Sequence, residues 1–220
     1  MLARTYDTFK LAYQDLAYMI ATYGKPNGKS KEGTNYFYQV TSPKKKSLTP
    51  HQPWANLEFK ERISGKPLNP GKAWKAQAAK WEPLLESQKI GNGLIQQAFS
   101  YTYSERISYQ MDNILEELGN NLESGEAFIS IWDPYADTQR LSRRRVPTVL
   151  GYQFLLRSHK LEMTCLQREC DLYNDYQDDV YLAFRLQKYL AKELGIPTGN
   201  FYHWIGSLFT LAVPPEEKRG

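Results

Sequence analysis

The chain has 220 residues, 41% of them hydrophobic and 24% charged, which is the composition of a folded globular protein and excludes a disordered chain. Its formal net charge of +4 is compatible with an anionic ligand but too small to indicate direct binding to nucleic acid. No apolar run is long enough to span a membrane and no secretory leader is recognised, so we expect a cytoplasmic protein with a single domain over residues 1–220.

Helices are expected to dominate the first half of the chain. Between residues 6 and 23, apolar side chains recur every three or four positions, as on the buried face of a helix, and Gly24 ends the run. The same reasoning extends to the following segments. We expect helices over residues 6–23, 54–63, 73–85 and 109–118, a loop over residues 27–33 and a strand over residues 36–41.

The second half carries the strongest β pattern. Three strands are expected over residues 127–132, 149–156 and 160–166, the last two joined by a short turn. A helix over residues 180–194 follows, with its apolar residues on one face, and a last helix is expected to begin near Gly199. This order predicts an α+β fold with a mostly β centre flanked by helices.

One stretch, TCLQRECDLYNDYQDDVY over residues 164–181, is unusually polar. It gathers ionisable groups where the third strand is expected to end. Such a cluster is either a solvated turn, in which Asp and Asn are common, or the wall of a ligand site. Its two cysteines, Cys165 and Cys170, have neither metal-ligand spacing nor the pattern of a disulfide framework, so no metal is expected.

Motifs in the second half resemble those of the thymidylate synthase family, in the same order and at the same spacing. They are Trp132-Asp133-Pro134, Pro147-Thr148, Gln153-Phe154, the segment QRECD from Gln167 to Asp171, Asp179-Val180 and Ile205-Gly206-Ser207. Two earlier segments match more loosely, EFKERISG beginning at Glu58 and YSERI beginning at Tyr103. The likeness covers most of residues 30–210. It implies a thymidylate synthase-like mixed β-sheet flanked by helices, and a homodimer formed through the sheet.

The resemblance also implies a pyrimidine nucleotide as ligand and 5,10-methylenetetrahydrofolate as cofactor. By this likeness the substrate-binding candidates are Gln167, Arg168, Asp179 and Tyr103. Glu58 matches a glutamate that relays protons in the family, and the alternative is an ordinary exposed glutamate of a helix. Trp81 and Asp171 are the candidate folate contacts. Alternatively, Trp81 is a core residue and Asp171 caps a turn.

The standard nucleophile of the family is missing from this chain. The family adds a carbon unit at C5 of the pyrimidine after a cysteine thiolate attacks C6. Thr148 stands at the position of that cysteine, and no strong general base is evident beside it, so conjugate addition through Thr148 is not expected. Cys170 is the candidate replacement because Arg168 is near it, with packing in the core as the alternative. Glu169, next to Arg168, would repel a phosphate.

Two details favour the branch of the family that hydroxymethylates cytosine nucleotides. One is Ser207, where synthases usually carry Asp. The other is Asp179, where synthases carry an Asn that recognises uracil. A carboxyl group can accept from the N4 amino group of cytosine and, when protonated, donate to N3. Alternatively, Asp179 is the N-cap of the following helix, a role that Asp178 could also take.

We therefore expect a divergent thymidylate synthase or pyrimidine hydroxymethylase-like protein that acts on or binds a pyrimidine nucleotide or nucleoside, cytosine by preference. Its reaction, when it is active, is one-carbon transfer to C5. The alternatives are an inactive homologue that binds a nucleotide or a partner protein, and a changed chemistry on a related ligand. His159 and His203 show no partner pattern and are expected to be structural.

Overall fold

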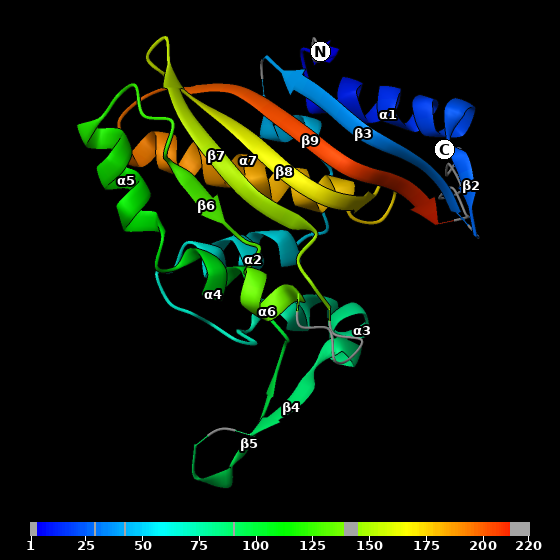
Figure 1. Ribbon diagram of the computed structural model, residues 1–220. Coiled ribbons are helices and arrows are strands. Elements are labelled where there is room, and N and C mark those ends of the chain that lie inside the picture. The colour runs from blue at the N-terminus through cyan, green and yellow to red at the C-terminus, as the bar shows by residue number, and fades with distance from the viewer. Residues whose placement is uncertain (1–3, 29, 42, 90, 139–144, 212–220) are drawn as a thin grey trace.

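A mixed β-sheet forms the centre of the computed structural model, which describes residues 4–28, 30–41, 43–89, 91–138 and 145–211 (Figure 1). Within these residues the sheet has seven strands in the order β1-β3-β9-β8-β7-β6, with β2 paired to β3 outside this path. The strands are β1 (Arg4–Tyr6), β2 (Lys25–Asn27), β3 (Ser30–Val40), β6 (Phe128–Ser130), β7 (Val149–Arg157), β8 (Lys160–Asp171) and β9 (Thr198–Leu211). The expected α+β class and mixed sheet are confirmed.

Strand β9 lies at the centre of the sheet, between one parallel and one antiparallel neighbour. It pairs in parallel with β8, where Cys165 lies opposite His203, and antiparallel with β3, where Tyr38 lies opposite His203. Helix α7 (Tyr176–Glu193) is the crossover that a parallel pair requires. This arrangement places His203 between two neighbouring strands in the middle of the sheet.

Helices α1 (Phe9–Tyr23) and α7 pack against one face of the sheet (Figure 1). The ring of Phe9 in α1 lies 5.3 Å from the ring of Phe184 in α7 and 5.1 Å from that of Phe201 in β9. Both helices therefore share one hydrophobic core with the sheet. The burial of aromatic side chains between the helices and the sheet stabilises the position of α7, whose first turns border the pocket described below.

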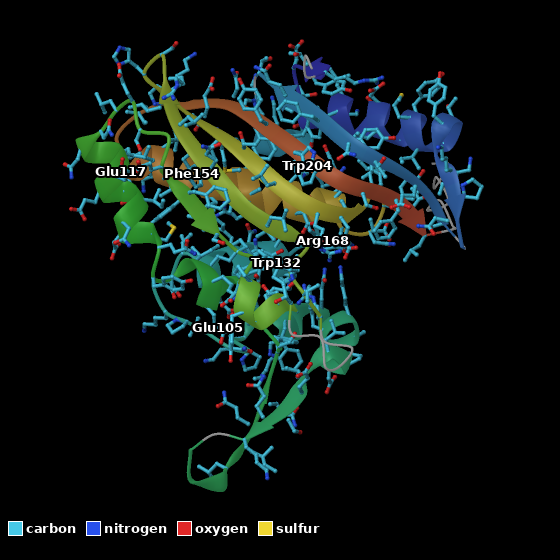
Figure 2. All side chains as sticks on the ribbon, viewed as in Figure 1. Glu105, Glu117, Trp132, Phe154, Arg168 and Trp204 are labelled. Atoms are coloured by element: carbon cyan, nitrogen blue, oxygen red, sulfur yellow. The ribbon has the colours of Figure 1, made fainter. Side chains whose placement is uncertain are left out.

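The opposite face of the sheet carries large apolar side chains that are only half-buried. Tyr202 and Trp204 alternate with the buried residues of β9, and Leu166 lies opposite Trp204 in the parallel ladder. Phe37 stacks on Tyr202 with an interplanar angle of 13°. Figure 2 labels Trp204 and Arg168, which both belong to this face by their place in the alternation. An aromatic patch of this kind is typical of a surface that another molecule covers.

The remaining short elements lie beside and below the sheet in Figure 1. They are η1 (Lys45–Ser47), α2 (Trp54–Arg62), η2 (Ala73–Gln77), α3 (Ala78–Trp81), η3 (Glu82–Leu84), η4 (Gly91–Gly93), α4 (Tyr103–Ile107), α5 (Met111–Asn120) and α6 (Pro134–Thr138). β4 (Glu86–Lys89) and β5 (Ile95–Ala98) form a separate hairpin that projects away from the rest of the molecule (Figure 1). No helix in the described part of the chain combines the length and the apolar character needed to cross a membrane.

Helix α4 is held by a capping box at its N-terminus. The Thr102 hydroxyl accepts from the backbone N–H of Glu105, and the Glu105 carboxylate accepts from the backbone N–H of Thr102. Glu105, labelled in Figure 2, also accepts a bond of 3.0 Å from the Asn69 side chain. The loop before η2 is therefore tied to α4, and this fixes Tyr103 at the start of that helix.

The last expected helix is wrong, because residues 198–211 form strand β9. Buried Phe201, His203 and Ile205 alternate with half-buried Tyr202 and Trp204, which is the period-two pattern of a strand. The neighbouring strands β3 and β8 supply hydrogen bonds on both edges. A run of aromatic and apolar residues is compatible with either element until those neighbours are in place.

Two other expectations also need correction. The expected loop over residues 27–33 lies mostly in the β2–β3 hairpin, where Ser30 pairs with Asn27. The expected helix over residues 73–85 is divided into η2, α3 and η3. Pro83 lies in the last of these and cannot donate a helical hydrogen bond. The helices expected over residues 54–63 and 109–118 are confirmed, with small shifts at their ends.

Candidate functional site

A single pocket gathers residues from segments that are far apart in the sequence. Its walls come from α2, the segment from η2 to η3, α4 and the first turns of α7, with two residues that precede β7. The described lining residues are Trp54, Glu58, Glu61, Arg62, Pro70, Trp74, Lys80, Trp81, Leu84, Phe99, Tyr101, Thr102, Tyr103, Ser104, Arg145, Thr148, Asp175, Asp178 and Asp179. This mixture of aromatic surface with a few charged groups is typical of a small-molecule site.

Helix α2 contributes an ion pair to the pocket. Glu58 and Arg62 lie one turn apart on the same face, and Arg62 Nε donates to Glu58 Oε1 over 2.9 Å. The guanidinium carbon of Arg62 also lies 3.7 Å from the centroid of the Tyr103 ring. Only 7% of the Arg62 side chain and 19% of the Glu58 side chain are exposed, so each charge depends on the other. Glu58 thus lies in the pocket with its carboxylate bound by Arg62.

Asp179 in α7 brings a second carboxyl group into the pocket. Its Oδ2 accepts a hydrogen bond of 2.6 Å from Gln167 Nε2. The side chain is half-buried and borders the pocket, and this burial, with Asp175 nearby, raises the pKa of Asp179 to about 7. The Gln167 bond and Arg62 act in the opposite direction but do not cancel the rise. Burial therefore favours the protonated form of Asp179 well above the pH at which an exposed carboxyl loses its proton.

The alternative N-cap role of Asp179 is wrong, and so is that of Asp178. Helix α7 begins at Tyr176, and its N-cap residue is Asp175. The backbone N–H of Asp179 donates to the Asp175 carbonyl, as in the interior of a helix. Asp178 instead accepts from the backbone N–H and the imidazole of His51, over 2.7 and 2.8 Å. Neither carboxylate is thus available to satisfy the first turn of the helix.

Thr148 lies on the pocket next to Tyr103. The two side chains are hydrogen-bonded, and the Thr148 carbonyl accepts from the backbone N–H of Arg168 over 2.6 Å. Burial raises the pKa of the Tyr103 phenol, Asp179 raises it further, and Arg62 and the Thr148 bond oppose the rise. Tyr103 therefore stays neutral and is a poor base for activating the Thr148 hydroxyl.

An aromatic wall, formed by Trp54, Trp74, Trp81, Phe99 and Tyr101, closes one side of the pocket. The Trp54 and Trp81 rings are stacked with centroids 5.5 Å apart. The guanidinium of Arg145 lies over Trp81 at 4.6 Å and over Tyr101 at 5.0 Å. The buried Nε1 atoms of Trp74 and Trp81 and the hydroxyl of Tyr101 have no hydrogen-bond partner within the described residues. These buried groups therefore lack the partner that a buried polar group ordinarily has.

The structure brings five of the candidate site residues together. Glu58, Tyr103, Thr148, Asp179 and Trp81 line the pocket. Gln167 does not line the pocket, but its side chain is hydrogen-bonded to Asp179, which does. The five come from α2, α3, α4, α7 and the segment before β7, so only the tertiary fold unites them.

Besides Gln167, three further candidates lie outside the pocket lining, and the contacts of each explain why. Arg168 Nη2 lies 2.6 Å from Glu169 Oε1, on the half-buried face of the sheet. Cys170 is 2% exposed, and this burial, with Asp179 and other acidic groups nearby, raises the pKa of its thiol well above the ordinary value. It lies within β8 rather than in a turn. The carboxylate of Asp171 accepts from the backbone N–H groups of Tyr173 and Asn174 and thus stabilises the turn after β8.

Two residues that sequence reasoning missed are prominent in the pocket. Arg62 follows Glu58 by four positions in a segment predicted to be helical, so the i,i+4 pattern of opposite charges was an available signal. Arg145 belongs to the run Arg143–Arg145, in which Arg143 and Arg144 lie outside the described residues. Nothing in the local sequence distinguishes Arg145 from its neighbours, because its contacts with Trp81 and Tyr101 are long-range.

The family model for thymidylate synthase matches residues 54–210, a span that includes every pocket residue named above. The chain belongs to the thymidylate synthase family. The family expected from the motifs is thereby confirmed, and the match extends over α2 and α4, where the motif evidence was weaker.

Archaeal members of the thymidylate synthase family are distant relatives of this chain, and each carries the name "Putative thymidylate synthase". The protein of Methanocaldococcus jannaschii is 26% identical over 179 residues, which cover 80% of this chain and 72% of the relative. Those of Methanosarcina barkeri and Methanothermobacter marburgensis are 29% identical over 120 residues and 33% identical over 108. These two alignments cover 52% and 46% of this chain, and 54% and 47% of the relatives, so the chain matches about half of each relative's length.

Proposed function

We propose that the pocket binds a pyrimidine nucleotide or nucleoside and prefers cytosine to uracil, within nucleotide metabolism. The observation that carries this proposal is the Asp179 carboxyl group, which borders the pocket and has a pKa of about 7. A protonated carboxyl offers one donor and one acceptor side by side, which complements N3 and the N4 amino group of cytosine. Gln167 supports this role because its bond of 2.6 Å holds the carboxyl in one orientation.

The charged groups of the pocket favour a ligand with at most one anionic group near the aromatic wall. Arg62 is neutralised by Glu58, and Arg168 is paired with Glu169 outside the pocket lining. Arg145, stacked on the aromatic wall, is the candidate for binding an anionic group of the ligand. This supports a nucleoside or a monophosphate rather than a ligand with several phosphates.

The aromatic wall fits the planar ring of a folate. Trp74 and Trp81 contribute aromatic surface and two indole N–H donors that have no partner among the described residues, and a folate ring carries acceptors for such donors. Trp81 is therefore a proposed folate contact. Asp171 is not, because its carboxylate is hydrogen-bonded to backbone N–H groups of the turn after β8. When bound, 5,10-methylenetetrahydrofolate would supply the one-carbon unit for C5. A thermal-shift assay with tetrahydrofolate tests this assignment: we expect stabilisation that is lost in Trp81→Ala.

The geometry favours binding over one-carbon transfer by the usual addition chemistry. Both cysteines of the chain are buried and outside the pocket lining, and Thr148 is the side chain that stands where the resemblance places the nucleophile. An alcohol needs a strong base for this attack. Tyr103 is neutral and Glu58 is bound to Arg62, so neither is suited to that task. A ligand-binding homologue that does not catalyse the reaction is therefore the favoured function, and one-carbon transfer is the second candidate.

We expect no methylation of dUMP by the purified protein. With 5-tritiated dUMP and 5,10-methylenetetrahydrofolate present, tritium should not be released, because no thiolate is available to attack C6. Thr148→Cys alone should not restore full activity, since Gly125-Glu126 stands where the resemblance implies the phosphate-binding arginines. Tritium release by the unmutated protein above a heat-denatured control would overturn the assignment as a binding protein.

Calorimetry with cytosine and uracil ligands tests the base preference. A mispaired amino or carbonyl group in a buried site costs roughly 1–3 kcal/mol, which corresponds to about five- to a hundredfold in affinity. We expect dCMP or cytidine to bind more tightly than dUMP or uridine by such a factor. Asp179→Asn should reduce or reverse this preference, because an amide can donate to O4 and accept from N3–H of uracil.

Asp171→Asn is the control for that experiment, since it changes a carboxylate that lies outside the pocket lining and is engaged in the turn after β8. It should leave the ratio of cytosine to uracil affinity unchanged. Equal affinity of the unmutated protein for the two bases would remove the base-reading role of Asp179 and, with it, the proposed preference.

We also propose that the protein is a homodimer formed through the half-buried face of the sheet. The aromatic patch that includes Phe37, Tyr202 and Trp204 supports this, because such a surface is unfavourable in water. Sedimentation at micromolar concentration should show a dimer. Trp204→Glu should shift it towards monomer by placing a charge in the interface. A stable monomer of the unmutated protein would contradict the proposal.

A further inference from the structure

Five buried or half-buried side chains form one continuous chain of hydrogen bonds that ends at the pocket. In order they are Tyr176, Tyr38, His203, Gln167 and Asp179. The oxygen atoms of Tyr176 and Tyr38 are 2.7 Å apart, and Tyr38 is 2.8 Å from His203 Nδ1. His203 Nε2 is 2.8 Å from Gln167 Oε1, and Gln167 Nε2 is 2.6 Å from Asp179 Oδ2. The chain therefore links the core of the protein to the carboxyl group at the pocket.

The innermost residue determines the direction of every bond in this chain. The Tyr176 phenol is fully buried, and within the described residues its hydroxyl has Tyr38 as its hydrogen-bond partner. An O–H without an acceptor in a buried site is costly, so Tyr176 donates to Tyr38. Tyr38 must then donate to His203 Nδ1, which leaves the imidazole proton on Nε2. Burial keeps the imidazole neutral by lowering the pKa of His203 to about 3.

The same direction continues to Asp179. His203 Nε2–H donates to Gln167 Oε1. The Gln167 amide therefore cannot rotate to exchange its oxygen and nitrogen, because its own N–H donors would then face the N–H donor of His203. Gln167 Nε2–H therefore donates to Asp179 Oδ2, which is an acceptor. When the carboxyl group is protonated, its proton lies on Oδ1. The pocket then always presents the acceptor and the donor of Asp179 in the same places.

We propose that Tyr176, Tyr38 and His203 are positioning residues for base recognition. For a ring held in one orientation, cytosine and uracil present donor and acceptor in opposite order at N3 and at the C4 substituent. A carboxyl group whose proton has a fixed place accepts one order and rejects the other. This inference rests on the base-reading role proposed for Asp179, and it adds a positioning role to the structural one expected for His203.

One variant removes a hydroxyl from this series of hydrogen bonds, and a second variant removes a buried hydroxyl outside it. Tyr38→Phe deletes the hydroxyl between Tyr176 and His203, and it changes no side chain that lines the pocket. The imidazole and the Gln167 amide can then adopt either orientation, so both carboxyl arrangements become available. Tyr181→Phe is the control, because it also removes a buried phenol hydroxyl, one that is bonded to Asn56. A general loss of packing or stability would affect both variants.

Two measurements test the proposal. The first is ¹⁵N NMR of histidine-labelled free protein, in which we expect neutral His203 with its proton on Nε2, and a mixture of tautomers in Tyr38→Phe. The second is calorimetry with cytidine and uridine, in which Tyr38→Phe should reduce the affinity ratio about fivefold while Tyr181→Phe leaves it unchanged.

The outcomes separate this inference from the proposed function. A proton on His203 Nδ1 in the unmutated protein, or an unchanged affinity ratio in Tyr38→Phe, would overturn the positioning role. A lack of base preference in the unmutated protein would instead count against the proposed function, while the tautomer measurement, which needs no ligand, would still test the direction of the chain.

Discussion

Replacing Glu58 with Leu is expected to lower the free energy of unfolding by about 3 kcal/mol, the lower end of the range for breaking a buried ion pair. The reason is that the Arg62 guanidinium, 7% exposed, would lose its carboxylate partner and remain as an uncompensated charge. Stacking on Tyr103 does not replace that partner, since a cation over a ring is worth much less. Urea unfolding followed by circular dichroism measures the loss.

A double variant gives the same prediction a sharper form. Glu58→Leu combined with Arg62→Leu should recover most of the stability, because a pair of apolar side chains carries no desolvation cost. Lys80→Met is the control, because it breaks the ion pair between Lys80 and Asp175. The side chains of both residues are 41% exposed. This substitution should change the stability by less than about 1 kcal/mol. If Glu58→Leu were as mild as Lys80→Met, the Arg62 charge would not depend on Glu58.

Asp179 should make the stability of the protein fall as the pH rises from about 4 to about 7. In the unfolded chain this carboxyl loses its proton near its ordinary pKa of about 4, whereas burial keeps it protonated up to about 7 in the folded protein. The folded state therefore binds more protons in this window. The stabilisation is complete below the lower pKa and is lost as the pH passes the higher one. The total is on the order of 4 kcal/mol.

The comparison of the unmutated protein with Asp179→Asn isolates this effect. His203 has the opposite slope, because a buried neutral imidazole costs stability as the pH falls, but it is present in both proteins. Asp175, Asp178 and Arg62, which also act on Asp179, are likewise unchanged. Urea unfolding at about pH 5 and about pH 8 should show that Asp179→Asn stabilises the protein more at the higher pH. An equal difference at both values would mean that Asp179 is ionised throughout.

Local sequence patterns predicted the fold class and several of the elements. The dense apolar run over residues 149–156 identified β7, and the three-to-four spacing in residues 6–23 identified α1 because one face of that helix is buried. The failure at β9 has a physical cause. Strand pairing is a long-range interaction, and β9 has a neighbour on each side that its own sequence does not specify.

The sequence by itself determined the family and the residue types available to the site, among them Thr148 and Asp179. Motif order carries this information because it does not depend on knowing the contacts. Only the tertiary structure decided what each group does. It turned Arg168 towards Glu169, buried Cys170 in β8 and engaged Asp171 in a turn, while it set Arg62 against Glu58 and linked His203 to Asp179. Burial and the partners of a polar group set its charge and orientation, and both arise from residues distant in the chain.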